Sequence, residues 1–108
     1  MIDFYIKKGD SLPALRLVLQ DSAGTVIDLT GATVAFNYQL RYPVGAVTNR
    51  TATVYDEDNG IVEYYWATED VATPGIYNGE FIVTFDDGSE MTFPVRGPFV
   101  FEILEDIS

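Results

Sequence analysis

The residues best suited to binding a metal ion are the acids of Asp56-Glu57-Asp58-Asn59-Gly60, which match the first half of an EF-hand loop, D-x-D-x-G. A complete EF-hand loop needs a bidentate glutamate at its twelfth position, and that position is Ala67. The first carboxylate of such a loop also follows a helix, whereas the residues before Asp56 alternate like a strand. We therefore interpret this segment, and the pair Asp86-Asp87, as solvated hairpin loops, and expect no metal site.

Catalytic chemistry is poorly represented in this sequence, because it contains no histidine and no cysteine. This composition excludes thiolate chemistry, the usual zinc sites and a histidine general base. Without such a base, the serine and threonine hydroxyls are not activated as nucleophiles. With 17 acids in 108 residues, some carboxylate pairs reach the separation found in glycosidases by chance, so they indicate nothing. We expect a protein that is not an enzyme and binds no cofactor.

Aromatic side chains suggest a binding function instead. Alternation places Tyr5, Tyr42, Tyr55 and Tyr65 outside the predicted core, and sugar rings stack on flat aromatic faces. Outward tyrosines on strands are also ordinary cross-strand packing partners. Glycan binding is therefore kept as an alternative function.

The net charge of −11 limits the partners. Nucleic acids and anionic membrane surfaces both require clustered lysine and arginine, so neither is expected as a partner. The N-terminal residues lack the apolar core of a signal peptide, and no apolar run is long enough to span a bilayer. We expect a soluble protein.

The elements that position these residues are short strands. Apolar residues alternate with period two, which is typical of strands with one buried face. Turn signals recur every 8 to 12 residues, as in an antiparallel β-sandwich. One domain is expected over residues 1–108. Chain breaks include Arg96-Gly97-Pro98, and the predicted strands cover residues 4–7, 15–20, 33–41, 50–55, 61–67, 77–85, 90–94 and 99–104.

The centre of the sandwich is predicted at residues 59–85, which hold the only tryptophan. A five-residue loop at 56–60 pairs Val54 with Val62, whereas a tight Asn59-Gly60 turn pairs it with Tyr65, and the longer loop keeps apolar residues on one face. Residues 68–72 favour one helical turn capped by Thr68. The predicted core contains Phe36, Val62, Tyr64, Trp66, Tyr77, Phe81 and Val83.

Three segments together resemble a known family: IKKGDSLPALRLVLQDSAG (6–24), DLTGATVAF (28–36) and NGIVEYYWATEDVATPGIYNGEFIVTFDDGSEMTF (59–93). In this order they are similar to the immunoglobulin-like N-terminal domains of tailed-phage baseplate upper proteins, and to related small phage virion proteins. The resemblance implies an all-β, immunoglobulin-like antiparallel sandwich of about 7–8 strands. It also implies a non-enzymatic structural component of a phage virion, on the tail, baseplate or capsid surface, made in the host cytoplasm.

Within that resemblance, Tyr77 takes the place of a tyrosine corner, at the start of the strand that follows Asp70 and Ala72. A tyrosine corner stabilises the fold through a hydroxyl-to-backbone hydrogen bond and has no role in binding. The partners implied are other virion proteins and further copies of the same chain.

The distribution of charge indicates where such a contact lies. No acidic residue occurs between Asp28 and Asp56, and this window of 27 residues carries +2, while the rest of the chain carries −13. Copies of an acidic protein repel one another, so contacts are easiest where acids are absent. The alternative is a loop region that lacks acids by chance. The predicted partner-binding residues are the arginines and apolar residues of this window: Arg41, Tyr42, Pro43, Val44, Val47 and Arg50.

Overall fold

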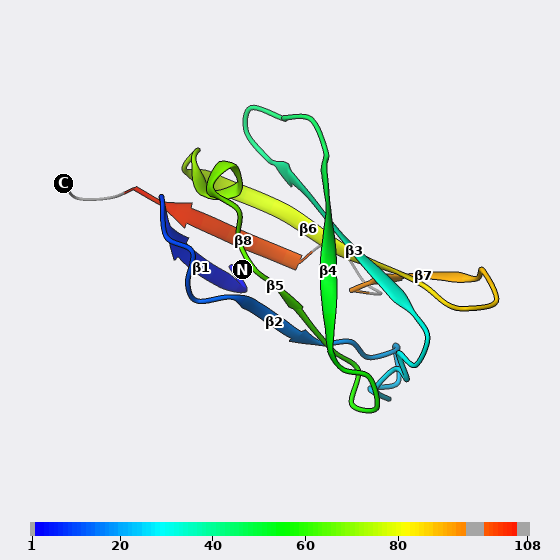
Figure 1. The fold of residues 1–108 in the computed structure, drawn as a ribbon. Helices are drawn as coiled ribbons and strands as arrows, with labels where there is room; N and C mark the ends of the chain where they lie inside the picture. The colour runs from blue at the N-terminus through cyan, green and yellow to red at the C-terminus, as the bar shows by residue number, and fades with distance from the viewer. Residues whose placement is uncertain (1, 95–98, 106–108) are drawn as a thin grey trace.

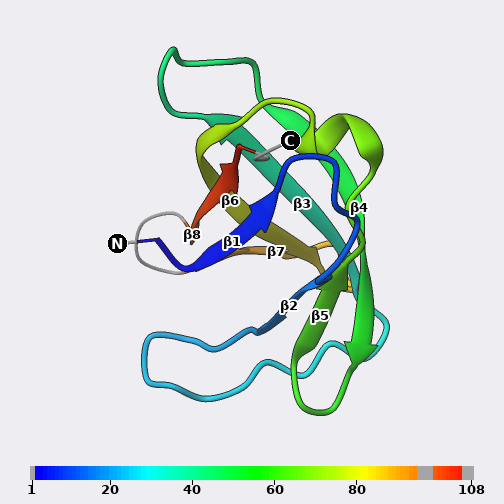
Figure 2. The ribbon, with the colours of Figure 1, turned by 90° about the vertical axis from the view of Figure 1, so that its left-hand side faces the viewer.

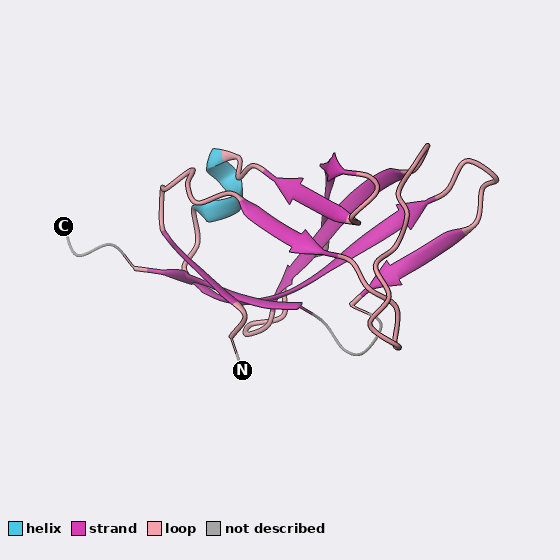
Figure 3. Cartoon of the chain, turned by 90° about the horizontal axis from the view of Figure 1, so that it is seen from below, coloured by secondary structure: helices cyan, strands magenta, loops and turns pink. Residues whose placement is uncertain are grey.

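The structure is a computed structural model that describes residues 2–94 and 99–105. Strands make up nearly all of its regular structure, with one short 3-10 helix (Figure 3). In chain order the elements are β1 (Phe4–Lys7), β2 (Leu15–Val18), β3 (Thr33–Leu40), β4 (Thr48–Asp56), β5 (Ile61–Tyr64), η1 (Thr68–Val71), β6 (Gly75–Thr84), β7 (Glu90–Phe93) and β8 (Phe99–Leu104).

The strands form two layers that share β4 (Figures 1 and 2). The first layer has the order β1-β8-β6-β3 and then the beginning of β4, and β7 continues beside β6 beyond β8. The end of β4 pairs instead with β5, and β5 pairs with β2, to form the second layer. The β2-β5-β4 and β3-β6-β8 groupings are those of an immunoglobulin-like sandwich. The predicted fold class is therefore confirmed.

The expectation of a wholly antiparallel sandwich is wrong at one edge. β1 runs parallel to β8, with Phe4 opposite Phe101 and Ile6 opposite Ile103. The chain passes from one layer to the other between β1 and β2, so β1 joins the layer of β8 and does not pair with β2. The remaining strand pairs are antiparallel.

Most predicted strands are found, with shifts at their ends. β4 begins two residues earlier than expected, at Thr48, and β5 ends at Tyr64, so Trp66 lies beyond the strand. The register that pairs Val54 with Val62 is confirmed, and a bulge follows it. The break predicted at Arg96-Gly97-Pro98 lies outside the described residues.

The helical turn η1 is present, but its cap differs from the prediction. Ala67 occupies the N-cap position in an extended conformation, one residue before Thr68. Its N–H donates 2.8 Å to the carboxylate of Asp70, three residues later. An acid at this position reaches back to the N-cap, so Asp70 performs the capping that was assigned to Thr68.

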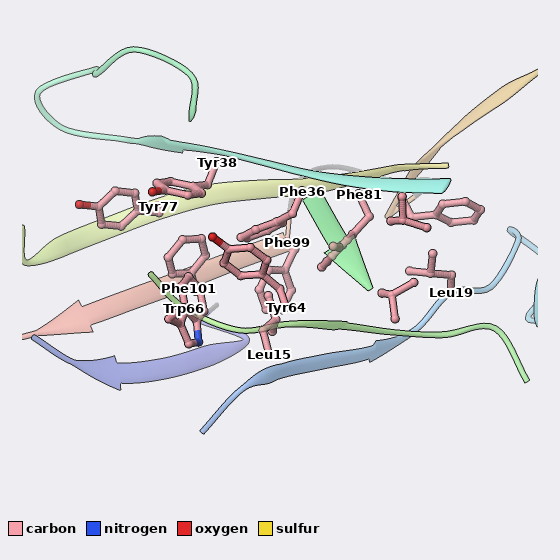
Figure 4. Packing of buried hydrophobic residues seen from close by; sticks show 14 of the residues in the cluster. Leu15, Leu19, Phe36, Tyr38, Tyr64, Trp66, Tyr77, Phe81, Phe99 and Phe101 are labelled. Carbon is pink, nitrogen blue, oxygen red and sulfur yellow. The ribbon is translucent and has the colours of Figure 1, made fainter. Parts of the chain in front are cut away.

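The space between the layers is filled by aromatic rings (Figure 4). Phe36 lies at the centre, with its ring centroid 4.8 Å from that of Phe81 and 5.0 Å from that of Tyr64. Trp66 is 5% exposed, and its indole N–H donates to the carbonyl of Pro13 at 3.1 Å. The seven residues predicted for the core are all buried: Phe36, Val62, Tyr64, Trp66, Tyr77, Phe81 and Val83.

The hydroxyl of Tyr77 donates to the carbonyl oxygen of Thr73 at 2.6 Å. This bond closes the connection between η1 and β6, which is the geometry of a tyrosine corner. Its ring stacks on Phe101 at 5.1 Å, so the residue serves the core and the corner together. Within residues 2–94 and 99–105, no helix is long and apolar enough to cross a membrane.

Candidate functional site

The most prominent surface feature is the connection between β3 and β4, residues 41–47, which projects from the sandwich (Figure 1). We call it the β3–β4 loop. Its side chains are unusually exposed for apolar residues, at 79% for Tyr42, 72% for Val44 and 60% for Val47. The guanidinium of Arg41 lies 5.8 Å from the ring centroid of Tyr42, within cation–π range.

Hydrogen bonds hold this loop in a defined shape. The side-chain amide of Gln39 donates to the carbonyl of Gly45 at 2.7 Å, and the N–H of Gly45 donates to Leu40 at 3.1 Å. The N–H of Arg41 donates to the carbonyl of Ile76 on β6 at 2.9 Å. A loop fixed at both its base and its middle loses little conformational entropy when it binds a partner.

Arg50, the sixth residue predicted for partner binding, is already paired with acids of its own domain. It lies opposite Phe36 on β4, and its Nε is 3.0 Å from the carboxylate of Asp70. A second carboxylate, that of Glu69, is 3.7 Å away. The positive charge of Arg50 therefore stabilises buried structure, and its role toward a partner stays a prediction, as for Arg41, Tyr42, Pro43, Val44 and Val47.

The partner of Arg50 is a buried carboxylate that the sequence did not single out. Asp70 has no exposed side-chain area and accepts hydrogen bonds from Tyr38, Tyr64, the Ala67 N–H and Arg50. Burial alone would raise the pKa of Asp70, but these four donors outweigh it and hold the pKa below its usual value. Burial, and then the hydrogen bond to Asp70, raise the pKa of Tyr38 to about 12.

A signal for this network was present in the sequence. Alternation placed Tyr38 and Tyr64 on inward faces, and a buried tyrosine hydroxyl requires a hydrogen-bond partner. Asp70 is an acid inside a short helical turn close to Tyr64 in sequence, and so was an available acceptor. Alternation could not predict that Arg50 on β4 approaches Asp70, because that contact depends on how distant segments pack.

The outer face of the β2-β5-β4 layer carries a second cluster. Arg16 lies opposite Glu63, and two of its nitrogens donate to one oxygen of Glu63, at 3.0 and 2.5 Å. The guanidinium also stacks 3.8 Å from the ring centroid of Tyr55. Hydrogen bonding from Tyr65 and Arg16 holds the pKa of Glu63 below its usual range. The exposed tyrosines Tyr55 and Tyr65 thus cover an ion pair, which is a structural role.

The four tyrosines considered for glycan binding are not gathered on one face. Tyr55 and Tyr65 belong to the β2-β5-β4 layer, whereas Tyr5 lies on β1 at the edge of the other layer. Tyr42 stands alone on the β3–β4 loop and is the most exposed of them. All four lie outside the core, as alternation predicted, but they do not form one shared stacking surface.

Three aspartates of the turns accept hydrogen bonds from side chains within the same turn. Asp56 accepts the side-chain amide of Asn59 at 2.8 Å, and Asp87 accepts the hydroxyl of Ser89 at 2.6 Å. Asp28 accepts the hydroxyl of Thr30 in the same way. Across the described part of the chain, no three acidic, histidine or cysteine side chains converge as metal ligands.

Fold and loop together define an immunoglobulin-like sandwich domain that presents one rigid, apolar, acid-free loop. No protein-family model matches the chain, and no curated protein matches it.

Proposed function

We propose that this protein is a non-enzymatic structural component of a bacteriophage virion, an assembly or decoration module of the tail, baseplate or capsid surface. The observation that carries the assembly role is the β3–β4 loop, which presents exposed apolar side chains in a fixed shape. The virion assignment is supported by the resemblance of residues 6–24, 28–36 and 59–93 to phage immunoglobulin-like domains.

The composition of the loop suits a protein contact. Tyrosine and arginine are enriched among residues that dominate binding energy, and here Arg41 lies close to the ring of Tyr42. The loop falls within the acid-free window, so it can approach acidic surfaces that repel the rest of the chain. Other virion proteins, or further copies of this chain, supply such surfaces.

The test is incorporation into particles. Arg41→Glu combined with Tyr42→Ala removes the positive charge and the aromatic ring, and both side chains lie outside the core. We expect an unchanged thermal midpoint and a loss of the protein from purified particles, measured by quantitative mass spectrometry. Tyr65→Ala is the matched control, because Tyr65 is a comparably exposed tyrosine on the other layer. Incorporation of the double variant at wild-type occupancy would contradict the proposal.

Glycan binding is the second candidate function. One observation favours it, a side-chain amide oxygen enclosed without a hydrogen-bond partner at the base of the β3–β4 loop. An enclosed acceptor of this kind costs stability unless a ligand satisfies it.

A further inference from the structure

The side-chain oxygen of Asn78, on β6, is enclosed but accepts no hydrogen bond from the protein. Among the residues that the structure describes, Asn78 Oδ1 is the only enclosed side-chain oxygen or nitrogen that forms no hydrogen bond with a protein group. Leaving such a group unpaired costs about 1–3 kcal/mol. Asn78 points to the outer face of the sheet, opposite Gln39 on β3, so the cost is not imposed by core packing.

Asn78 lines two small grooves beside the β3–β4 loop. The first, of about 230 Å³, is lined by Asn37, Tyr38, Gln39, Val47, Asn78, Gly79 and Glu80. The second, of about 250 Å³, adds Arg41, Tyr42 and Val44 from the loop. Gln39 and Asn78 line both grooves, so the grooves adjoin at these two side chains, and we call the pair the depression.

We propose that this depression binds a neutral saccharide, with Asn78 Oδ1 accepting a hydrogen bond from one sugar hydroxyl. Side-chain amides both donate and accept, which matches the paired hydroxyls of a pyranose. Each groove is smaller than the roughly 300–1,000 Å³ of a site for a drug-sized ligand, so each accommodates about one sugar ring. This inference rests on the second candidate function and adds its site and its ligand class.

The strands form the floor of the depression, and the β3–β4 loop forms its wall. Asn37 lies opposite Glu80, and Gln39 lies opposite Asn78, so the floor is a ladder of polar side chains across β3 and β6. The exposed ring of Tyr42 lines the second groove and offers a flat face for stacking. Gln39 keeps that wall in place through its bond to Gly45.

Other ligand classes fit this depression less well. Anionic ligands are repelled by the net charge of −11 and, in the first groove, by Glu80; the one cation of the depression, Arg41, lines the second groove alone. Apolar ligands would remove water from the side-chain amides without replacing the lost hydrogen bonds. A peptide strand needs an open sheet edge, but β3 pairs with β4 and β6, and β6 pairs with β3 and β8 along this stretch.

The experiment titrates the intact protein with cellobiose, maltotriose, lactose and chitobiose, followed by NMR of the side-chain amides. At least one sugar should produce saturable shifts of the Asn37, Gln39 and Asn78 amide signals. Asn78→Val should then weaken that affinity by at least about tenfold. Its thermal midpoint should stay equal or rise, because the change removes an unpaired oxygen and places a β-branched residue in a strand.

Thr51→Val is the control, since Thr51 is an exposed polar residue on β4 that lines neither groove. It should bind the sugar as the wild type does. Equal affinity in Asn78→Val would overturn this site while leaving glycan binding intact, and no response of the wild type to any sugar would overturn both. Saturation by an acidic sugar or a peptide alone would overturn the ligand class. Particle incorporation of Asn78→Val should stay at the wild-type level, which separates this site from the assembly role.

Discussion

Replacing Asp70 with asparagine removes the charge at the centre of the buried network without changing its size. The wild-type carboxylate accepts hydrogen bonds from Tyr38, Tyr64, the Ala67 N–H and Arg50. Asparagine keeps one carbonyl oxygen but turns an N–H₂ group toward hydroxyls and a guanidinium that also donate. Breaking a buried ion pair on one side costs about 3–5 kcal/mol, and hydrogen bonds to charged groups contribute about 1.5–3 kcal/mol each. Because Arg50 is partly exposed, solvent screens its share, and we expect a loss of about 3–5 kcal/mol in total.

The assay is urea unfolding followed by the fluorescence of Trp66, which is buried in the native state. A domain of this size has about 5–15 kcal/mol of stability, so the variant should lose a large share of it. Asp58→Asn is the control, because it removes the same charge from an exposed loop position. If the free energies of unfolding of Asp70→Asn and Asp58→Asn differ by less than about 1 kcal/mol, the four donors do not need a charged acceptor, and the predicted role of the Asp70 charge is wrong.

The same variant defines a pH dependence. The pKa of Asp70 is lowered in the folded protein from its usual value of 3.8, so its charge stabilises the fold above that pH. That contribution is lost as the pH falls through the lower, folded pKa. The stability difference between the wild type and Asp70→Asn should therefore be largest near neutral pH and shrink in acid below pH 3.8. A constant difference across this range would show that Asp70 contributes through packing alone.

Four further outcomes are expected. Trp66→Ala should cost about 3–5 kcal/mol, and the native tryptophan emission should be blue-shifted; red-shifted emission open to quenchers would contradict its burial. Tyr77→Phe should cost about 0.5–1.5 kcal/mol by urea unfolding, through the lost bond to Thr73, and a neutral change would remove the corner's role. In a spectrophotometric titration, the Tyr38 hydroxyl should ionise near its raised pKa of about 12. The contribution of the neutral hydroxyl to stability is full below pH 10 and is lost toward pH 12. Ionisation of Tyr38 near pH 10 would refute this prediction. Millimolar calcium should leave the thermal midpoint unchanged, whereas a saturable rise abolished by Asp56→Asn would establish a calcium loop.

Local pattern predicted the strands and the core because both depend on period-two alternation. Val34, Phe36 and Tyr38 lie inward on β3, and Tyr77, Phe81 and Val83 lie inward on β6, as alternation requires. The register of Val54 and Val62 followed from the need to keep apolar residues on one face. These features involve neighbours in sequence or adjacent strands.

The features that sequence could not predict arise where distant segments meet. The parallel pairing of β1 with β8 joins the two ends of the chain, and nothing in either segment alone specifies its direction. Arg50 was predicted as a partner anchor because it lies in the acid-free window, and nothing in the sequence indicated that a buried acid from η1 lies within its reach. The depression at Asn78 depends on the loop folding beside β3 and β6, and no short motif records this arrangement.

The buried network and the exposed loop are physically connected through β3 and β4. Tyr38 is the last residue of β3 paired with β4 before the loop, opposite Thr48, and its hydroxyl is held by Asp70. On the opposite face of the same strand segment, Gln39 fixes Gly45 and lines both grooves. A binding surface keeps its shape when the residues behind it are locked by packing and hydrogen bonds. The hydrogen bonds of Asp70 therefore fix the end of β3 behind the β3–β4 loop, where both the proposed assembly contact and the proposed sugar site need a rigid support.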